Sequence, residues 1–132
     1  MTIFTTLVES ECNQYTGTSQ YYRHGLGLFY TDGIEWIAKT LECFWLLDEI
    51  AIYSQKFRGK EDFLTAEFYT PIKGEGILQL TDGNENTLHK SKYDFTTLYV
   101  DKDLNKKKER YIKLFLTVGL ENKYVLMLPS EY

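Results

Sequence analysis

The stretch "CFWLLDEIAIYSQKF", Cys43–Phe57, decides how the rest of the chain is interpreted. Its residues recur with a helical period, and apolar side chains occupy nearly every side of the predicted helix. Asp48 and Glu49 are the acidic interruption. A helix that is apolar almost all round is normally the buried central element of a domain. We therefore expect this helix to lie in the interior, covered by the rest of the chain.

The residues before this stretch also follow a helical pattern. The segment Thr5–Tyr15 predicts a short first helix, and Thr31–Glu42 predicts a second one that begins at an N-cap residue, Thr31 or Asp32. Between them lies "QYYRHGLGLFYTDGIEW", Gln20–Trp36. It matches neither the dinucleotide-binding fingerprint nor a P-loop, so we expect its glycines to shape the path of the chain into the second helix.

From Asp62 onward the hydrophobic period becomes two, as in strands that face a core on one side. The strands predicted in this half are Phe63–Thr70, Gly76–Gly83, Tyr111–Val118 and Lys123–Pro129, with weaker candidates at Asn86–Ser91 and Asp94–Val100. The prediction is an α+β fold in which two or three N-terminal helices pack on one face of an antiparallel sheet of five to six strands. We expect a single domain over residues 1–132, with a helical part at 1–58 and a β-sheet part at 61–132.

Composition narrows the function classes. The net charge of −4 gives no general attraction to nucleic acid or to an anionic membrane. Aromatic residues make up 16% of the chain, more than a core of this size needs, which suits a recognition surface. Cys12 and Cys43 cannot form a disulfide framework, and no secretion signal or membrane-spanning run is visible. The expectation is a cytoplasmic protein that carries reduced thiols.

Recognised catalytic and metal-binding motifs are missing from the sequence. His24 and His89 are far apart, and the cysteines have no C-x-x-C spacing, so no zinc site is predicted. The loop that begins at Asp82 lacks the glycine and glutamate of a calcium-binding EF-hand. We therefore predict no metal and no cofactor.

A basic cluster lies in "KDLNKKKERYIK", Lys102–Lys113. The first interpretation is a solvated loop that protects a sheet edge. Contact with nucleic acid is the weaker alternative, through Lys106, Lys107, Lys108 and Arg110.

Asp48 and Glu49 lie beside Trp45 on the predicted central helix, and carboxylates beside apolar surface need partners. The nearest basic candidates in the sequence are Arg23 and His24, and we expect "YYRH" to fold back over this helix and to pair Arg23 with Asp48 or Glu49. Such a seam is either a structural ion pair or an aromatic-walled ligand site. The candidate binding residues are Tyr21, Tyr22, Arg23, His24, Tyr30, Asp32, Trp45, Asp48, Glu49 and Tyr132.

Four blocks of sequence carry a resemblance: "QYYRH" at Gln20–His24, "YTDG" at Tyr30–Gly33, "WLLDEI" at Trp45–Ile50 and "LPSEY" at Leu128–Tyr132. Together they resemble a family of small bacterial proteins of unknown function that occurs on plasmids, phages and other mobile elements. The resemblance implies that the four blocks belong together in the fold. It transfers no catalytic residue. We also expect the Tyr132 ring to dock, with the chain carboxylate near Arg23.

Three functions follow from the sequence. The first is a non-enzymatic binding protein of a phage or mobile element, an inhibitor or sequestering factor that acts on a host defence protein or a small ligand. Its oligomeric state is open. The second is a small enzyme that uses His24 with Asp32 or Asp48 as acid and base. The third is an accessory protein that contacts nucleic acid through Lys106–Arg110.

Overall fold

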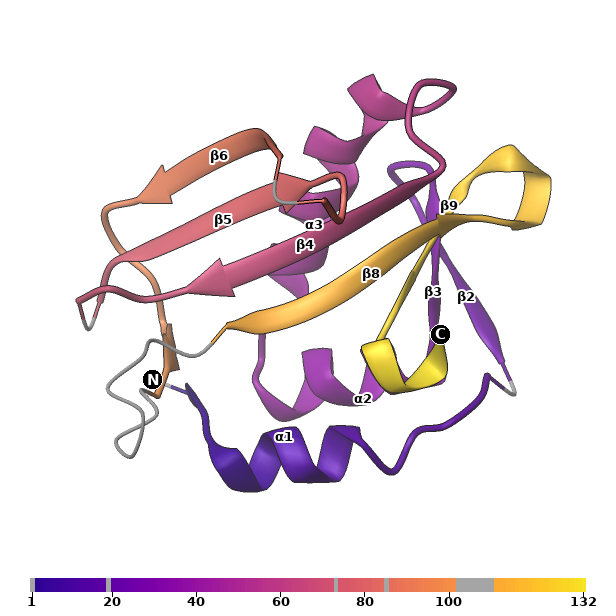
Figure 1. Cartoon of the computed structure of the whole chain (residues 1–132). Helices are drawn as coiled ribbons and strands as arrows, with labels where there is room; N and C mark the ends of the chain where they lie inside the picture. The colour runs from indigo at the N-terminus through magenta and orange to yellow at the C-terminus, as the bar shows by residue number, and fades with distance from the viewer. Residues whose placement is uncertain (1, 19, 73, 85, 102–110) are drawn as a thin grey trace.

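Three helices and nine strands make up an α+β arrangement in the computed structural model, which describes residues 2–18, 20–72, 74–84, 86–101 and 111–132 (Figure 1). The helices are α1 (Thr6–Cys12), α2 (Asp32–Thr40) and α3 (Phe44–Ser54), with short 3-10 turns η1 (Gln55–Phe57), η2 (Leu120–Asn122) and η3 (Pro129–Glu131). The strands are β1 (Thr2–Phe4), β2 (Tyr21–His24), β3 (Leu28–Thr31), β4 (Phe63–Tyr69), β5 (Gly76–Thr81), β6 (Thr87–Tyr93), β7 (Leu98–Val100), β8 (Ile112–Val118) and β9 (Tyr124–Met127).

Seven of the strands form one sheet in the order β2-β3-β9-β8-β4-β5-β6. All neighbours in it are antiparallel except β3 and β9, which run parallel. β1 and β7 form a separate parallel pair. The predicted α+β class and mostly antiparallel sheet are confirmed, but five to six strands is too few. The segment interpreted as a connection supplies β2 and β3, and the first residues form β1.

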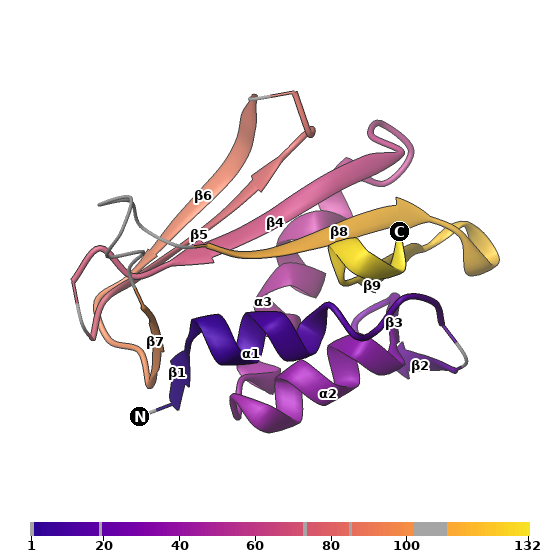
Figure 2. The same ribbon diagram turned by 60° about the horizontal axis from the view of Figure 1, so that its bottom comes forward.

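The core lies between the helices and the inward side chains of the sheet. Alternate residues of the central strands are buried, including Leu64, Ala66 and Phe68 on β4. They share one hydrophobic cluster with side chains of α2 and α3, among them Ile37 and Ile50. Figures 1 and 2 show α3 behind β4 and β5, and α1 and α2 side by side below β8. The period of two in the apolar residues therefore marks the face that packs on the helices, although Thr65 of β4 is buried as well.

Helix α3 is buried on one side and open on the other, which corrects the expectation of an almost wholly interior helix. Leu46, Leu47, Ile50 and Ala51 are buried, whereas Phe44 is 40% and Ile52 49% exposed. The two edge strands of the sheet, β2 and β6, contact the two flanks of α3. The side of the helix between these flanks therefore stays exposed to solvent.

The C-terminus closes over the start of α2. Of the two predicted N-cap candidates, Thr31 is the N-cap residue, and its hydroxyl accepts a hydrogen bond from the Ile34 N–H. The same hydroxyl donates to the Glu131 carboxylate at 2.6 Å, which also accepts from the Leu128 N–H at 3.0 Å and the Gly33 N–H at 3.3 Å. A Cβ on Gly33 would lie 2.5 Å from the carboxylate, so this contact requires glycine. The blocks "YTDG" and "LPSEY" thus meet here.

We expect Glu131→Ala to lower the free energy of unfolding by about 3 kcal/mol, because it leaves a hydroxyl and two backbone N–H groups of a half-buried site without their acceptor. Glu121→Ala is the matched control. It removes an exposed carboxylate whose surface pair with Arg23 contributes at most about 1 kcal/mol. Urea unfolding measures both, and equal losses in the two variants would contradict the role given to Glu131.

Candidate functional site

The β2–β3 hairpin reaches the first flank of α3 through His24. The His24 Nε2 atom lies 2.7 Å from Asp48 Oδ1, and the Leu26 N–H donates to His24 Nδ1 at 3.0 Å. Because Nδ1 is an acceptor, Nε2 carries the proton and donates a hydrogen bond to Asp48. Gln55 adds a second contact by donating to the Leu26 carbonyl at 2.7 Å. The predicted contact between "YYRH" and the acids of "WLLDEI" is therefore present, through His24.

Arg23 does not take part in this seam. Its guanidinium pairs with Glu121 at 2.7 Å and lies 4.9 Å from the centre of the Phe29 ring. Since Tyr21–His24 is a strand, neighbouring side chains point to opposite faces, and Arg23 and His24 cannot both reach α3. The expectation that Arg23 pairs with Asp48 or Glu49 was wrong for this reason.

The second flank of α3 faces β6, the other edge of the sheet. The His89 ring stacks on Tyr53 with their centres 4.1 Å apart. Lys56 Nζ lies 3.0 Å from His89 Nδ1, and His89 Nε2 lies 2.7 Å from the Ser91 hydroxyl. Burial and then the charge of Lys56 lower the pKa of His89. The neutral ring thus accepts from Lys56 and donates to Ser91.

Both ring nitrogens of His24 and both of His89 contact other groups of the protein, so either histidine would have to release one of these contacts to take a proton from a substrate. Ser91 receives a hydrogen bond from His89 instead of giving up its proton to it. Asp32 follows Thr31, which pairs with Tyr21 at the far end of the hairpin from His24. Of the two aspartates of the enzyme alternative, His24 therefore contacts Asp48, and Asp32 lies at the other end of the hairpin.

A cavity of about 220 Å³ opens beside α3, next to the contact between α3 and β6. The residues that line it are Trp45, Glu49, Tyr93, Phe95, Thr96 and Thr97. The Trp45 and Tyr93 rings lie 5.9 Å apart at an angle of 67°, so they form two walls of a corner. Trp45 also packs edge-on against buried Phe68, which fixes its position. Phe95 is 79% exposed at this site.

Glu49 and Tyr93 give the cavity its polar character. The Tyr93 hydroxyl is buried and makes no hydrogen bond of normal geometry to a described residue, although Glu49 and Ser91 are its polar neighbours. Burial, followed by the charge of the Glu49 carboxylate, raises the pKa of Tyr93. No lysine or arginine of the described residues forms an ion pair with Glu49. We call this site the α3 cage: Trp45, Glu49, Tyr93 and Phe95.

The structure divides the remaining sequence-predicted residues among separate places. Tyr22 stacks on Tyr30 across the hairpin with ring centres 5.3 Å apart, and Tyr21 is exposed. Asp32 starts α2. The centre of the Tyr132 ring lies 5.6 Å from that of Phe63 and 5.5 Å from that of Phe115, so the ring rests on the sheet, although the residue is 74% exposed. Within the described part of the chain, the ion pair of Arg23 is with Glu121 and not with the C-terminus.

The residues predicted from the sequence include Trp45 and Glu49 of this cavity but not Tyr93 and Phe95, nor His89 beside it. A usable signal was the alternation of His89, Ser91 and Tyr93, which places these three side chains on one face of a strand. Lys106, Lys107, Lys108 and Arg110 of the weaker nucleic-acid alternative lie outside the described residues.

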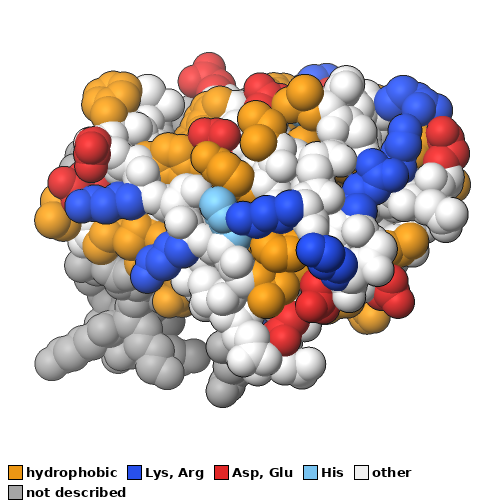
Figure 3. Space-filling model, turned by 90° about the horizontal axis from the view of Figure 1, so that it is seen from above, with side chains coloured by type: hydrophobic (Ala, Val, Ile, Leu, Met, Phe, Trp, Pro, Cys, Tyr) orange, Lys and Arg blue, Asp and Glu red, His pale blue; other side chains and the backbone are white. Residues whose placement is uncertain are grey.

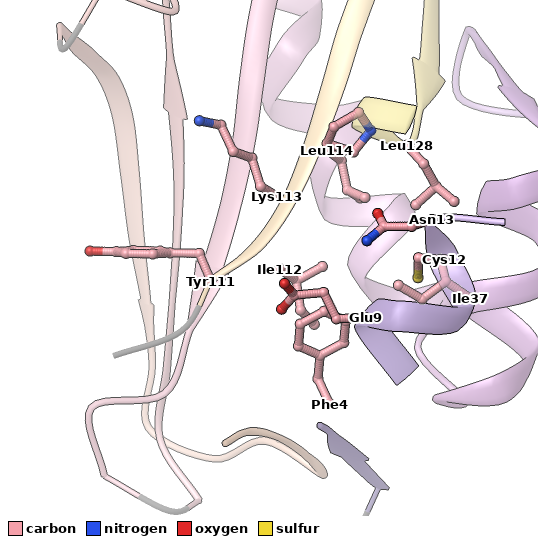
Figure 4. A pocket seen from close by; sticks show the side chains of 11 residues that line it. Phe4, Glu9, Cys12, Asn13, Ile37, Tyr111, Ile112, Lys113, Leu114 and Leu128 are labelled. Atoms are coloured by element: carbon pink, nitrogen blue, oxygen red, sulfur yellow. The ribbon is translucent and has the colours of Figure 1, made fainter. Parts of the chain in front are cut away.

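A second cavity of about 240 Å³ lies between α1, α2 and β8 (Figure 4). Its inner wall consists of core side chains such as Phe4 and Ile37, and Cys12 borders it. Burial, then the nearby carboxylates, raises the pKa of Cys12 to about 12, so its thiol is a poor nucleophile at neutral pH. Burial raises the pKa of Cys43 to about 12 as well. The charged residues that line this cavity are Glu9 and Lys113.

In the described ranges of the chain, no helix has the length and apolar character to cross a bilayer. Within the same ranges, no three histidine, cysteine, aspartate or glutamate side chains lie close enough to share a metal ion.

Comparison with known proteins places the chain in a family. The model described as "Family of unknown function (DUF6876)" matches residues 6–132. The chain belongs to this family. The match covers almost the whole sequence, including every residue of the α3 cage and of the His24 seam. No curated protein and no solved structure matches the chain.

We expect Asp48→Ala to lower the free energy of unfolding by about 0.5–1 kcal/mol, since it removes the acceptor of His24 from a pair whose aspartate is 56% exposed. Asp48→Asn keeps an acceptor oxygen and should stay close to wild type. Glu42→Ala, which removes a neighbouring exposed carboxylate, is the control. Thermal unfolding of the wild type and the three variants measures this. Equal stabilities of Asp48→Ala and Glu42→Ala would show that the contact between His24 and Asp48 does not stabilise the fold.

His89 should make stability depend on pH in a defined direction. Its pKa is lowered in the folded protein, so the unfolded chain takes up the proton more readily as the pH falls. The contribution of His89 is therefore complete above about pH 6.5 and is lost below it. In His89→Gln the fall in unfolding free energy between pH 7.5 and 5.5 should be smaller than in wild type. Urea unfolding at both pH values tests this, and parallel curves would refute it.

Proposed function

We propose that the protein is a non-enzymatic binding protein that recognises its partner through the open side of α3. The observation that carries this proposal is the α3 strip: Phe44, Asp48 and Ile52, which follow one another at a spacing of four residues on the solvent side of the helix. Phe44 and Ile52 are large apolar residues exposed to solvent, with Asp48 between them. Exposed apolar side chains grouped on one surface and mixed with charges are typical of interaction sites.

The surroundings of the α3 strip enlarge this surface. On one flank the hairpin contributes exposed Leu26, held against Gln55. On the other flank lies the α3 cage with exposed Phe95. Figure 3 views the molecule from above, and hydrophobic side chains lie there between acidic and basic ones. Both flanks are fastened by side-chain contacts, so the surface is preorganised, which lowers the entropy lost on binding.

The acids of this surface indicate the character of the partner. Asp48 and Glu49 lie on it, and Asp48 is the one engaged with His24. A partner with apolar and basic side chains would complement it. The partner we propose is a host protein or a host-derived small ligand, and the protein would act as an inhibitor or sequestering factor of a phage or mobile element. The mobile-element context is supported by the sequence resemblance, and a host defence protein is the partner that this context favours.

Substitution of the α3 strip should abolish capture of the partner. We expect Phe44→Ser with Ile52→Ser to reduce the recovered partner at least about tenfold, because central apolar residues dominate interface energies. The measurement is affinity capture from host lysate, quantified by mass spectrometry and followed by native mass spectrometry of the complex.

The matched control changes two exposed apolar residues elsewhere, Leu7→Ser and Ile72→Ser. It should recover the partner as wild type does. Equal recovery by the α3 variant and wild type would show that the partner does not bind to the α3 strip.

A further inference from the structure

The α3 cage combines two features that a positively charged ligand needs. The first is a set of aromatic faces: Trp45 and Tyr93 meet at 67° and form a corner, and Phe95 lines the same cavity. The faces of aromatic rings carry negative electrostatic potential, so a cation that touches several of them is attracted by each. Trp45 cannot swing away easily, because its ring is held edge-on against the buried Phe68.

The second feature is the carboxylate of Glu49, which has no cationic partner among the described residues. Glu49 is half-buried in the cavity wall, and none of the described lysines or arginines pairs with it. A carboxylate that is partly removed from water is disfavoured unless a counter-charge or hydrogen-bond donors compensate it. The hydroxyl of Tyr93 lies near it but has no hydrogen bond of normal geometry to a described residue. A ligand cation would supply a counter-charge for the Glu49 carboxylate, whose polar neighbour in this cavity is the Tyr93 hydroxyl.

The same arrangement rejects other ligand classes. An anion would meet Glu49 at short range and the aromatic faces, and both repel negative charge. A neutral apolar group would fill the corner but would leave the Glu49 carboxylate desolvated. A guanidinium group is planar and would need a flat stacking surface, whereas rings at 67° surround a compact, rounded group better.

We propose that the α3 cage binds an alkylammonium group, with Trp45, Tyr93 and Phe95 around the cation and Glu49 as its counter-charge. The group is the head of a small ligand of the choline type or the end of a lysine side chain, methylated or not, that the partner presents. This inference rests on the proposed binding function and specifies its ligand chemistry. It follows the general use of aromatic cages for ammonium cations.

The test follows the indole N–H signals of the chain's two tryptophans by nuclear magnetic resonance during titration with tetramethylammonium chloride. Sodium chloride keeps the ionic strength constant. The Trp45 signal should shift to saturation with a dissociation constant on the order of 1 mM. The Trp36 signal serves as an internal reference, because that ring packs against Tyr15 away from the cage. A Trp36→Phe variant assigns the two signals.

Variants separate the charge from the rings. Glu49→Gln should weaken tetramethylammonium binding at least about fivefold, and Phe95→Ala, at a residue too exposed to endanger the fold, should weaken it similarly. Glu42→Gln and Ile72→Ala, at exposed positions outside the cage, should bind as wild type does. Titration with choline and with N-acetyl-trimethyllysine amide distinguishes the two sources of the alkylammonium group. Tighter binding of choline indicates a small ligand, and tighter binding of the lysine derivative indicates a side chain of the partner.

A neutral isostere of choline, 3,3-dimethyl-1-butanol, decides whether charge matters. An equal shift with this alcohol, or unchanged affinity in Glu49→Gln, would overturn the inference. If tetramethylammonium fails to bind while the α3-strip variant still loses its partner, the cage inference fails and the binding function stands. If tetramethylammonium binds and the α3-strip variant keeps its partner, the cage inference stands and the proposed function fails.

Discussion

The structure depends on helix α3 lying between the two edges of one sheet. β2 and β6 end the seven-stranded sheet on opposite sides, and each carries one of the chain's two histidines to a flank of the helix. His24 hydrogen-bonds to Asp48, and His89 stacks on Tyr53. Edge strands tend to attract foreign strands unless something covers or charges them. Here α3 contacts one side chain from each edge strand, His24 of β2 and His89 of β6, and its buried apolar side completes the core.

The same arrangement explains why an apolar helix has an open side. The sheet covers only the half of α3 that faces its inward side chains, so Phe44 and Ile52 remain in solvent between the edges. Exposure of two large apolar residues is unfavourable in isolation. The proposed function would account for it, because a partner would bury both residues, and the proposed cage on the adjoining flank would give that partner a specific chemical anchor.

The predictability of the fold varied with the length and regularity of each pattern. Helices α1, α2 and α3 and the long strands β4, β5 and β8 follow from periods of 3.6 and two, because each repeats over enough residues to be distinct. β2 and β3 are four residues each and flank Gly25 and Gly27, so the glycines obscured a hairpin. That one omission also produced the wrong partner for Arg23, since only a strand sends Arg23 and His24 to opposite faces.

By itself the sequence determined the α+β class, the buried face of the long strands, the start of α2 at Thr31 or Asp32, and a contact between "YYRH" and the acids of "WLLDEI", because these depend on local periodicity and on the need to neutralise charge. Only the tertiary structure decided that β3 pairs in parallel with the distant β9, that Glu131 closes α2, and that Tyr93 and Phe95 join Trp45 and Glu49 around one cavity. These contacts join residues far apart in the chain. No local pattern encodes them, because each depends on how distant segments pack against one another.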